Sequence, residues 1–236
     1  MNIQKVFDRF CKNLQNRTGI MTEDNIRYYW FAAMLKEDDE LNNYTLEHPY
    51  KELDLKTQDI LQNEELDLLY ENKTNKEFFC FEMKFHRNNT DKSFAKTAAA
   101  GSIFNDLQRL QQITNKNAHR YFLYVTDPVM DDYLLPSKRK IKNDKYDQLL
   151  ADFYTPDKPK ERDLYYTDTE PTTFIDRANK SLNTNATTGS ANTLPLKLNL
   201  KLRLIHHNEK NTKIDSDSFK DKECHVRLYE VINEEL

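Results

Sequence analysis

The chain has 236 residues, of which 31% are charged and 38% apolar. That length can bury a substantial core, either as one domain or as a domain with a large insertion. No apolar run approaches the roughly 20 residues that a membrane-spanning helix needs, so we expect no membrane partner. With 3 glycines, the chain cannot form a glycine-rich phosphate loop or a dinucleotide-binding fingerprint, and we expect no nucleotide cofactor.

The net charge of −4 is unevenly distributed along the chain. Residues 1–83 hold 10 Lys and Arg against 17 Asp and Glu, a net of −7, whereas residues 84–145 hold 12 against 6, a net of +6. A basic central segment suits a polyanion, because phosphate contacts supply most of the non-specific affinity for nucleic acid. A solvated surface of mixed charge explains the same pattern, and charge alone favours that explanation.

The cysteines and the first residues predict a cytoplasmic protein. Cys11, Cys80 and Cys224 are odd in number, distant in sequence and without metal-ligand spacing, so we expect them to be reduced, with Cys80 filling core space. The chain does not begin with a basic and then apolar signal pattern. Its first apolar residues recur at helical spacing instead.

The predicted elements begin with two helices. The first covers about residues 1–14, and the second covers 23–37 with Thr22 as its N-cap. A strand is expected at 43–50, followed by a polar segment, 51–63, with room for a short helix. The apolar face of the first helix is formed by Val6, Phe7, Phe10, Cys11 and Leu14.

A β-hairpin is predicted next, because two strand-like runs flank the polar segment 71–77. A helix over 93–113 and a strand over 119–127 follow. The pattern weakens from 136 to 193, where prolines and a low-complexity stretch indicate loops. Two further strands are predicted at 194–205 and 224–232.

The second strand of the hairpin carries charges that a core strand rarely holds. Residues 78–87 read FFCFEMKFHR, and charges are seldom buried unless they are paired or bind something. Because side chains alternate along a strand, the apolar Phe79, Phe81, Met83 and Phe85 share one face. The other face carries Cys80, Glu82, Lys84 and His86.

In the first strand of the hairpin, the same alternation places Leu66, Leu68 and Tyr70 on one face and Glu65, Asp67 and Leu69 on the other. Asp67 is therefore expected beside Glu82 and Lys84. Two carboxylates close together resist joint ionisation unless a cation joins them. Mg²⁺ prefers such oxygen ligands, can polarise a phosphate oxygen and lowers the pKa of bound water. Lys84 could orient or deprotonate that water and stabilise developing negative charge, which is the chemistry of phosphodiester hydrolysis.

An acid near the end of one strand, followed by Glu-x-Lys on the next, resembles the PD-(D/E)XK nuclease superfamily. Six segments follow one another in the order typical of bacterial restriction-endonuclease-like proteins: TEDNIRYYWFAAML, LEHPY, ELDLLY, FEMKFHR, AGSIFNDLQRL and YFLYVTDPVMDDYL. The resemblance covers about residues 20–135. Leu66, rather than proline, precedes Asp67.

This resemblance implies an α/β fold with a restriction-endonuclease-like core, in which helices flank a central mixed sheet in the order αβββαβ. We expect a single nuclease-like domain over 1–236. Its core spans about 20–135, a loop-rich insertion spans 136–193, and C-terminal strands span 194–236.

The resemblance also implies roles for particular residues. Asp67 and Glu82 would be metal ligands together with the carbonyl oxygen of Met83, and Lys84 would be the catalytic lysine. Glu47 is expected to be a further catalytic acid and ranks above Glu23, which is an extra acid or a favourable charge at a helix N-terminus. Candidate phosphate contacts are Lys92, Lys96 and Arg87, with plain solvation as the alternative.

The expected function is that of a Mg²⁺-dependent deoxyribonuclease, with Mn²⁺ as a substitute, in bacterial restriction or anti-phage defence. DNA is the expected partner, and recognition of two half-sites would require a homodimer. Two alternatives stay open: a nucleic-acid-binding or regulatory module that keeps the fold without the chemistry, and a defence effector that needs oligomerisation or a signal. The sequence does not distinguish DNA from RNA.

Overall fold

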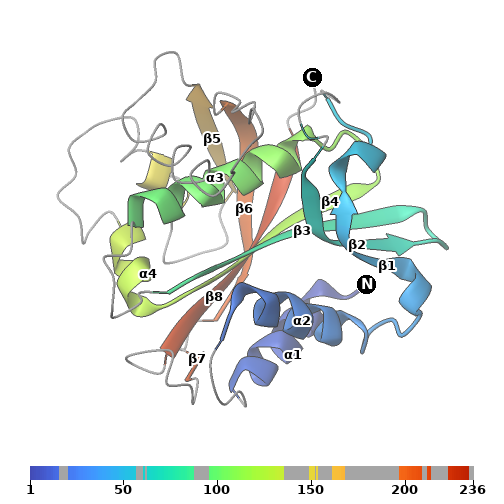
Figure 1. Cartoon of the computed structure of the whole chain (residues 1–236), viewed down its shortest axis with the longest axis horizontal. Coiled ribbons are helices and arrows are strands. Elements are labelled where there is room, and N and C mark those ends of the chain that lie inside the picture. The colour runs from blue at the N-terminus through green and yellow to red at the C-terminus, as the bar shows by residue number, and fades with distance from the viewer. Residues whose placement is uncertain are drawn as a thin grey trace.

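An eight-stranded mixed sheet organises the chain in the computed structural model (Figure 1). The strands lie in the order β1-β2-β3-β4-β8-β6-β5, with β7 paired to β8. Strands β3 and β4 are parallel, and the other described pairs are antiparallel. Their bounds are β1 Tyr44–Pro49, β2 Glu65–Asn72, β3 Glu77–His86, β4 Ala118–Thr126, β5 Glu161–Thr167, β6 Lys197–His207, β7 Thr212–Lys213 and β8 Glu223–Asn233.

The structure describes most of the chain, with several gaps. The described residues are 1–15, 21–56, 61, 63–87, 96–135, 149–151, 153, 161–167, 197–208, 212–213 and 223–233. Within these ranges, no helix is both long and apolar enough to span a membrane.

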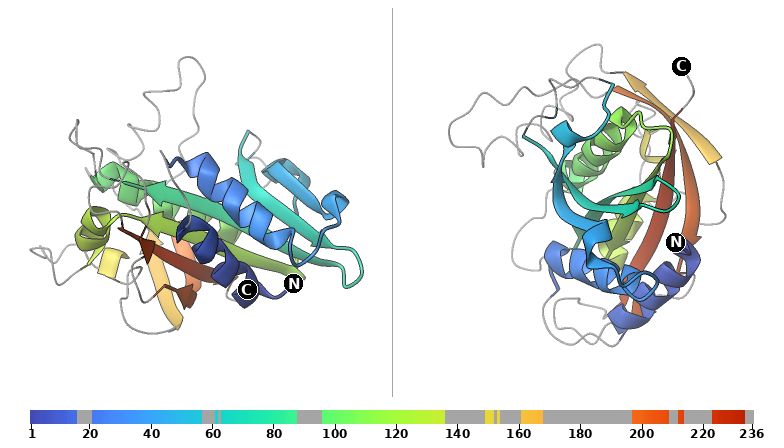
Figure 2. Two further views of the ribbon diagram at one scale, coloured as in Figure 1. Left: turned by 90° about the horizontal axis from the view of Figure 1, so that it is seen from below. Right: turned by 90° about the vertical axis from the view of Figure 1, so that its right-hand side faces the viewer.

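Helices cover both faces of the sheet (Figure 2). Helices α1 (Ile3–Gln15) and α2 (Glu23–Met34) pack on one face, whereas α3 (Lys96–Gln112) and α4 (Pro128–Leu134) pack on the other. Two 3-10 turns, η1 (Leu41–Asn43) and η2 (Tyr50–Glu52), flank β1. The prediction of an α/β fold with a mixed sheet between helices is therefore confirmed at this level.

The predicted alternation of β3 is confirmed. Phe79, Phe81, Met83 and Phe85 belong to the core cluster under α1 and α2, and Cys80 belongs to the cluster under α3. In β2 the alternation holds for Leu68, Leu69 and Tyr70. Leu66 departs from it, because it packs in the α3 cluster.

The departure at Leu66 lies where β1 is irregular. Glu47 of β1 has a φ of 51°, in the left-handed region that costs a non-glycine residue roughly 1–2 kcal/mol. Its neighbours Leu46 and His48 pair with Leu68 and Leu66. The ladder between β2 and β3 ends close by, with the pair Leu68–Phe81. Strict alternation therefore does not continue to the start of β2.

The capping prediction for α2 is confirmed. The hydroxyl of Thr22 accepts a hydrogen bond from the backbone N–H of Asn25, and the Asn25 side chain accepts one from the N–H of Thr22. This reciprocal cap satisfies two otherwise unpaired donors. It also fixes the first turn of the helix, which carries Glu23 and Asp24.

Four described elements are absent from the sequence-based expectations: η1, α4, β5 and the short strand β7. Helix α4 begins directly after β4, where Asp127 accepts a hydrogen bond from the N–H of Met130 and Pro128 occupies the first turn. Strand β5 lies inside the segment 136–193 that was expected to be loop-rich, and it pairs with β6. Strands β6 and β8 continue the same sheet next to β4.

Candidate functional site

Glu82 lies in the middle of β3 with its carboxylate enclosed on the α3 side. Only 1% of its side chain is exposed. The hydroxyl of Tyr50, at the start of η2, donates to Oε1 of Glu82 at 2.6 Å. The Nε atom of Arg109, from α3, donates to the same oxygen at 3.1 Å, and Nη2 lies 3.5 Å from Oε2. Both carboxylate oxygens of Glu82 are thus engaged by Arg109.

Asp67 lies one residue beyond the part of β2 that pairs with β3. Its Oδ2 accepts a hydrogen bond of 2.6 Å from the backbone N–H of Met83, in place of a ladder bond. Its Oδ1 lies 2.8 Å from Nη2 of Arg27, which comes from α2. Asp67 therefore joins the end of the hairpin to the helix on the opposite face of the sheet from α3.

Lys84 sits between two acids from different helices. Its Nζ lies 3.2 Å from Oδ2 of Asp106 in α3 and 3.4 Å from Oε1 of Glu23 in α2. The other oxygen of Glu23 accepts a hydrogen bond of 3.2 Å from the N–H of Phe85. Arg109 also pairs with Asp106 at 2.5 Å and with the more exposed Glu64 at 2.8 Å.

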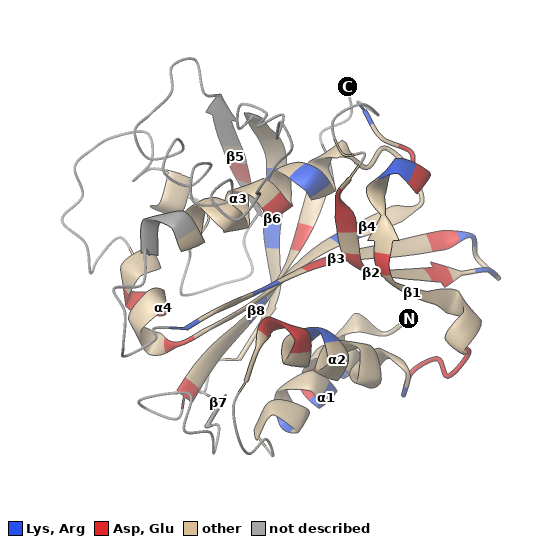
Figure 3. Ribbon diagram, viewed as in Figure 1, with Lys and Arg blue, Asp and Glu red and all other residues tan. Residues whose placement is uncertain are grey.

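These residues form one continuous ionic cluster, which we call the β3 cluster. It contains the cations Arg27, Lys84 and Arg109 and the acids Glu23, Asp24, Glu47, Glu64, Asp67, Glu82 and Asp106. Counted as ionised, seven carboxylates against three cations leave a charge of −4. Figure 3 shows that acidic and basic segments occur at the start of α2, in β3 and in α3.

Burial and this excess of acid shift the pKa values of the cluster. Burial raises the pKa of Glu82 to about 8; Arg109 opposes that shift, and Asp106 and Asp67 add to it. Burial also raises the pKa of Asp67, against the opposing effect of Arg27. For Lys84, burial alone would lower the pKa, but Asp106 and Glu23 raise it above its ordinary value. Lys84 therefore stays positively charged at neutral pH.

The β3 cluster has the oxygen ligands that a hard divalent cation prefers, but their present arrangement does not form a metal site. Among the described residues, no group of three or more His, Cys, Asp or Glu side chains is placed to hold a metal ion. The two expected ligands, Asp67 and Glu82, are held by Arg27 and Arg109 instead. The magnesium site stays a prediction.

The remaining sequence candidates lie around or outside this cluster. The side chain of Glu47 is 65% exposed and lies 3.7 Å from Arg27, whereas Glu23 contacts Lys84 directly. Arg87 follows β3 and is half-buried. Lys96 begins α3, but its side chain lies outside the described part of the structure, as does the whole of Lys92.

The sequence did not assign Arg27, Tyr50, Asp106 or Arg109 to the site, nor the more exposed acids Asp24 and Glu64. Asp106 and Arg109 lie in the helix that the sequence predicts over 93–113. Their spacing of three residues places them on one helical face, and that face turns toward β3. The only indication in the sequence was a pair of polar residues on a helix that precedes a buried strand. Such a pair does not reveal whether its face of the helix contacts the sheet or solvent.

His86 continues the same face of β3 beyond Lys84. One of its ring nitrogens lies 3.1 Å from the hydroxyl of Tyr124, and the other lies 3.3 Å from Oγ of Ser102 in α3. Burial, with a smaller effect of Lys84, lowers the pKa of His86 to about 3. This histidine is therefore neutral at ordinary pH.

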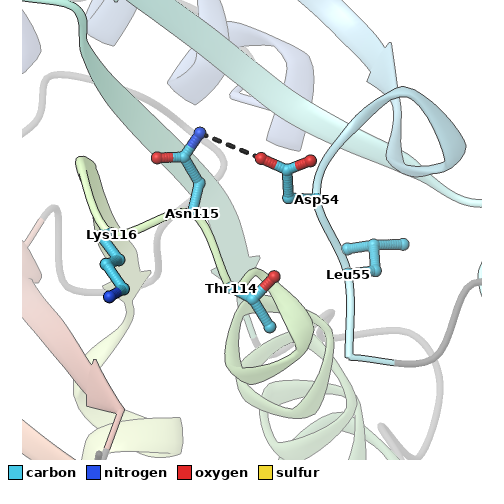
Figure 4. Close-up of a pocket in the computed structure, with 5 residues that line it drawn as sticks. All are labelled: Asp54, Leu55, Thr114, Asn115 and Lys116. Atoms are coloured by element: carbon cyan, nitrogen blue, oxygen red, sulfur yellow. Dashed lines mark hydrogen bonds between the residues drawn. The ribbon is translucent and has the colours of Figure 1, made fainter.

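A separate hollow lies beside the C-terminal end of α3 (Figure 4). Asn115 donates a hydrogen bond of 3.2 Å to Asp54 across it. The described lining residues are Asp54, Leu55, Thr114, Asn115 and Lys116, none of which belongs to the β3 cluster.

Comparison of the chain with models of protein families, with curated proteins and with solved structures finds no match.

Proposed function

We propose that this chain is a metal-dependent endonuclease that hydrolyses phosphodiester bonds in DNA, on a restriction-endonuclease-like core. The observation that carries the proposal is the contact network that joins Asp67, Glu82 and Lys84 where β2 and β3 cease to pair. The element order α2-β1-β2-β3-α3-β4 also agrees with the αβββαβ order that the resemblance implies.

In this proposal, Lys84 acts as a fixed positive charge. Asp106 and Glu23 keep it protonated, so it is better suited to stabilise negative charge that develops on a phosphate than to remove a proton from water. The two acids come from helices on opposite faces of the sheet and hold the ammonium group from both sides.

The proposed cofactor is Mg²⁺, with Mn²⁺ as a substitute. Asp67, Glu82 and the carbonyl oxygen of Met83 would hold it, and when bound it would polarise a phosphate oxygen and lower the pKa of a water molecule. Glu23 and Glu47 are the proposed additional acids. The structure brings Glu23 to Lys84 and leaves Glu47 largely exposed, so we now rank Glu23 first.

A plasmid-nicking assay in the presence of Mg²⁺ or Mn²⁺ tests the proposal. We expect Lys84→Ala to lower the cleavage rate by about 10²–10³-fold, as removal of a preorganised charge from an active site does. Lys73→Ala is the matched control, because Lys73 lies in the exposed turn of the same hairpin and its ammonium group donates to the backbone carbonyl of Asn42. Equal cleavage by wild type and Lys84→Ala would rule out the proposed role.

A second candidate is a nucleic-acid-binding or regulatory module without catalysis. The engagement of Asp67 and Glu82 by arginines favours it, because ion pairs alone can account for these buried charges. Under this alternative, a duplex oligonucleotide would shift in a gel equally with and without Mn²⁺, and no nicking would occur. The same assay with RNA decides the substrate.

The biological setting proposed for the nuclease is bacterial restriction or anti-phage defence in the cytoplasm. Cys11, Cys80 and Cys224 are free thiols, in agreement with a reducing compartment. A homodimer, or activation by a signal, would be detected as a change in nicking rate with protein concentration or with an added extract from infected cells.

A further inference from the structure

Two guanidinium groups hold the two carboxylates to which the proposed function assigns a metal ion. Arg27 reaches Asp67 from α2, and Arg109 reaches Glu82 from α3. The helices lie on opposite faces of the sheet (Figure 2). The carboxylate pair is therefore closed from both sides by positive charge that belongs to the chain itself.

All four oxygens of this pair are engaged in the structure. Oδ1 and Oδ2 of Asp67 contact Arg27 and the N–H of Met83, and both oxygens of Glu82 contact Arg109. A cation bound to both carboxylates would lie close to both guanidinium groups, and positive charges held that close repel one another unless an arginine moves away. The N–H of Met83 is fixed in the backbone of β3, and the hydroxyl of Tyr50, which also donates to Oε1 of Glu82, carries no charge. The guanidinium groups are therefore the donors that compete with a cation.

Both arginines have other carboxylates within reach. Arg27 lies 3.3 Å from Asp24 and 3.6 Å from Glu23. Arg109 lies 2.5 Å from Asp106 and 2.8 Å from Glu64. A buried guanidinium without a partner would be costly, but these acids can keep each group paired after it leaves Asp67 or Glu82.

We propose that Arg27 and Arg109 are internal counter-ions, which must leave Asp67 and Glu82 before these carboxylates can hold a divalent cation. This inference rests on the metal ligands of the proposed function. This exchange conserves the charge next to the carboxylates. Two guanidinium groups, each with one positive charge, move away from Asp67 and Glu82, and one ion with two positive charges takes their place. Removing either arginine should therefore tighten cation binding, although removal of a residue from a binding site normally weakens it.

The test is the affinity for Ca²⁺, which accepts the same oxygen ligands with flexible geometry, measured by titration calorimetry at constant neutral pH and ionic strength. We expect Arg27→Gln and Arg109→Gln to bind Ca²⁺ on the order of tenfold more tightly than wild type, because each loses a competing positive charge close to the site. Arg9→Gln, which breaks a 3.0 Å pair between Arg9 of α1 and Glu37 just beyond α2, should bind like wild type. Glu82→Gln, which loses a ligand, should bind more weakly.

Unchanged or weaker Ca²⁺ affinity in both arginine variants would overturn the inference. If Arg109→Gln does not fold, Arg27→Gln decides alone. Cleavage of DNA by wild type combined with unchanged affinities would remove the counter-ion role and keep the nuclease. Tighter Ca²⁺ binding by the variants of a chain that cuts no DNA would support the exchange and remove the nuclease, so the two failures are distinguishable.

Discussion

The Nζ atom of Lys84 lies 3.2 Å from Oδ2 of Asp106, which ties the middle of β3 to the helix that crosses over to β4. Asp106 is 2% exposed. Because its Oδ2 has no hydrogen bond within the described structure, the ion pair with Lys84 offsets the cost of burying this charged oxygen. The strand and the helix are thereby joined at the residue proposed to stabilise the reacting phosphate.

Asp106→Asn tests this relationship. We expect the nicking rate to fall about 10–100-fold, the usual cost of losing a residue that orients a functional group. The pKa of Lys84 should also fall, because Asp106 raises it. Acylation of Lys84 by an amine-reactive reagent, followed by mass spectrometry over a range of pH, measures that pKa. If the pH profile of labelling is the same in wild type and variant, Asp106 does not control the charge of Lys84.

Substitution of the two additional acids, Glu23 and Glu47, should affect the nicking rate to very different extents. Glu23→Gln removes a charge that contacts Lys84 and accepts from the N–H of Phe85, so we expect a 10–100-fold loss of nicking. Glu47→Gln changes a largely exposed side chain and should alter nicking by less than about twofold, as expected for a weak surface pair. Parallel nicking assays of both variants check this order. A larger effect of Glu47→Gln would restore the ranking that the sequence suggested.

Tyr50→Phe should destabilise the fold without removing a charge. It deletes the donor of the 2.6 Å hydrogen bond to buried Glu82, which is worth about 1–3 kcal/mol of unfolding free energy. Tyr44→Phe is the matched control, because its hydroxyl donates to the backbone carbonyl of Asp38 in a less buried place; about 0.5–1.5 kcal/mol is expected there. Urea unfolding curves measure both values. Equal losses of unfolding free energy in the two variants would mean that the hydrogen bond from Tyr50 to buried Glu82 stabilises the fold no more than the less buried one from Tyr44.

Acid should destabilise the fold partly through His86. The unfolded chain binds a proton on this histidine near pH 6.5, whereas the folded chain does not bind it until about pH 3. Between these values the unfolded state holds more protons, so the unfolding free energy falls as the pH falls, by up to about 1.4 kcal/mol per pH unit.

The measurement is urea unfolding of wild type and His86→Gln at several values between pH 7 and pH 4.5. Other groups titrate in the same range, so only the difference between the two proteins counts. Below pH 6.5, we expect the unfolding free energy of wild type to fall steadily relative to that of His86→Gln. A difference in unfolding free energy that stays constant with pH would show that His86 binds its proton equally well in the folded and the unfolded state.

The sequence by itself determined the elements that local physics controls. The capping of α2 by Thr22, the hairpin of β2 and β3, and the alternation from Phe79 to Phe85 depend on spacing along one short segment. The placement of Glu82 and Lys84 on the opposite face follows from the same period of two. These patterns involve neighbours in the chain, so a single sequence is enough to find them.

Only the tertiary structure decided which charges meet. Arg27, Asp67 and Arg109 are brought together with Glu82 by the packing of two helices on opposite faces of the sheet. Nothing in the local spacing of a polar helix residue distinguishes a solvated position from one that turns toward a buried strand. Packing selects between them, because a buried carboxylate requires a partner from whichever element covers it. The arginine partners of the expected metal ligands were therefore not predictable from the sequence.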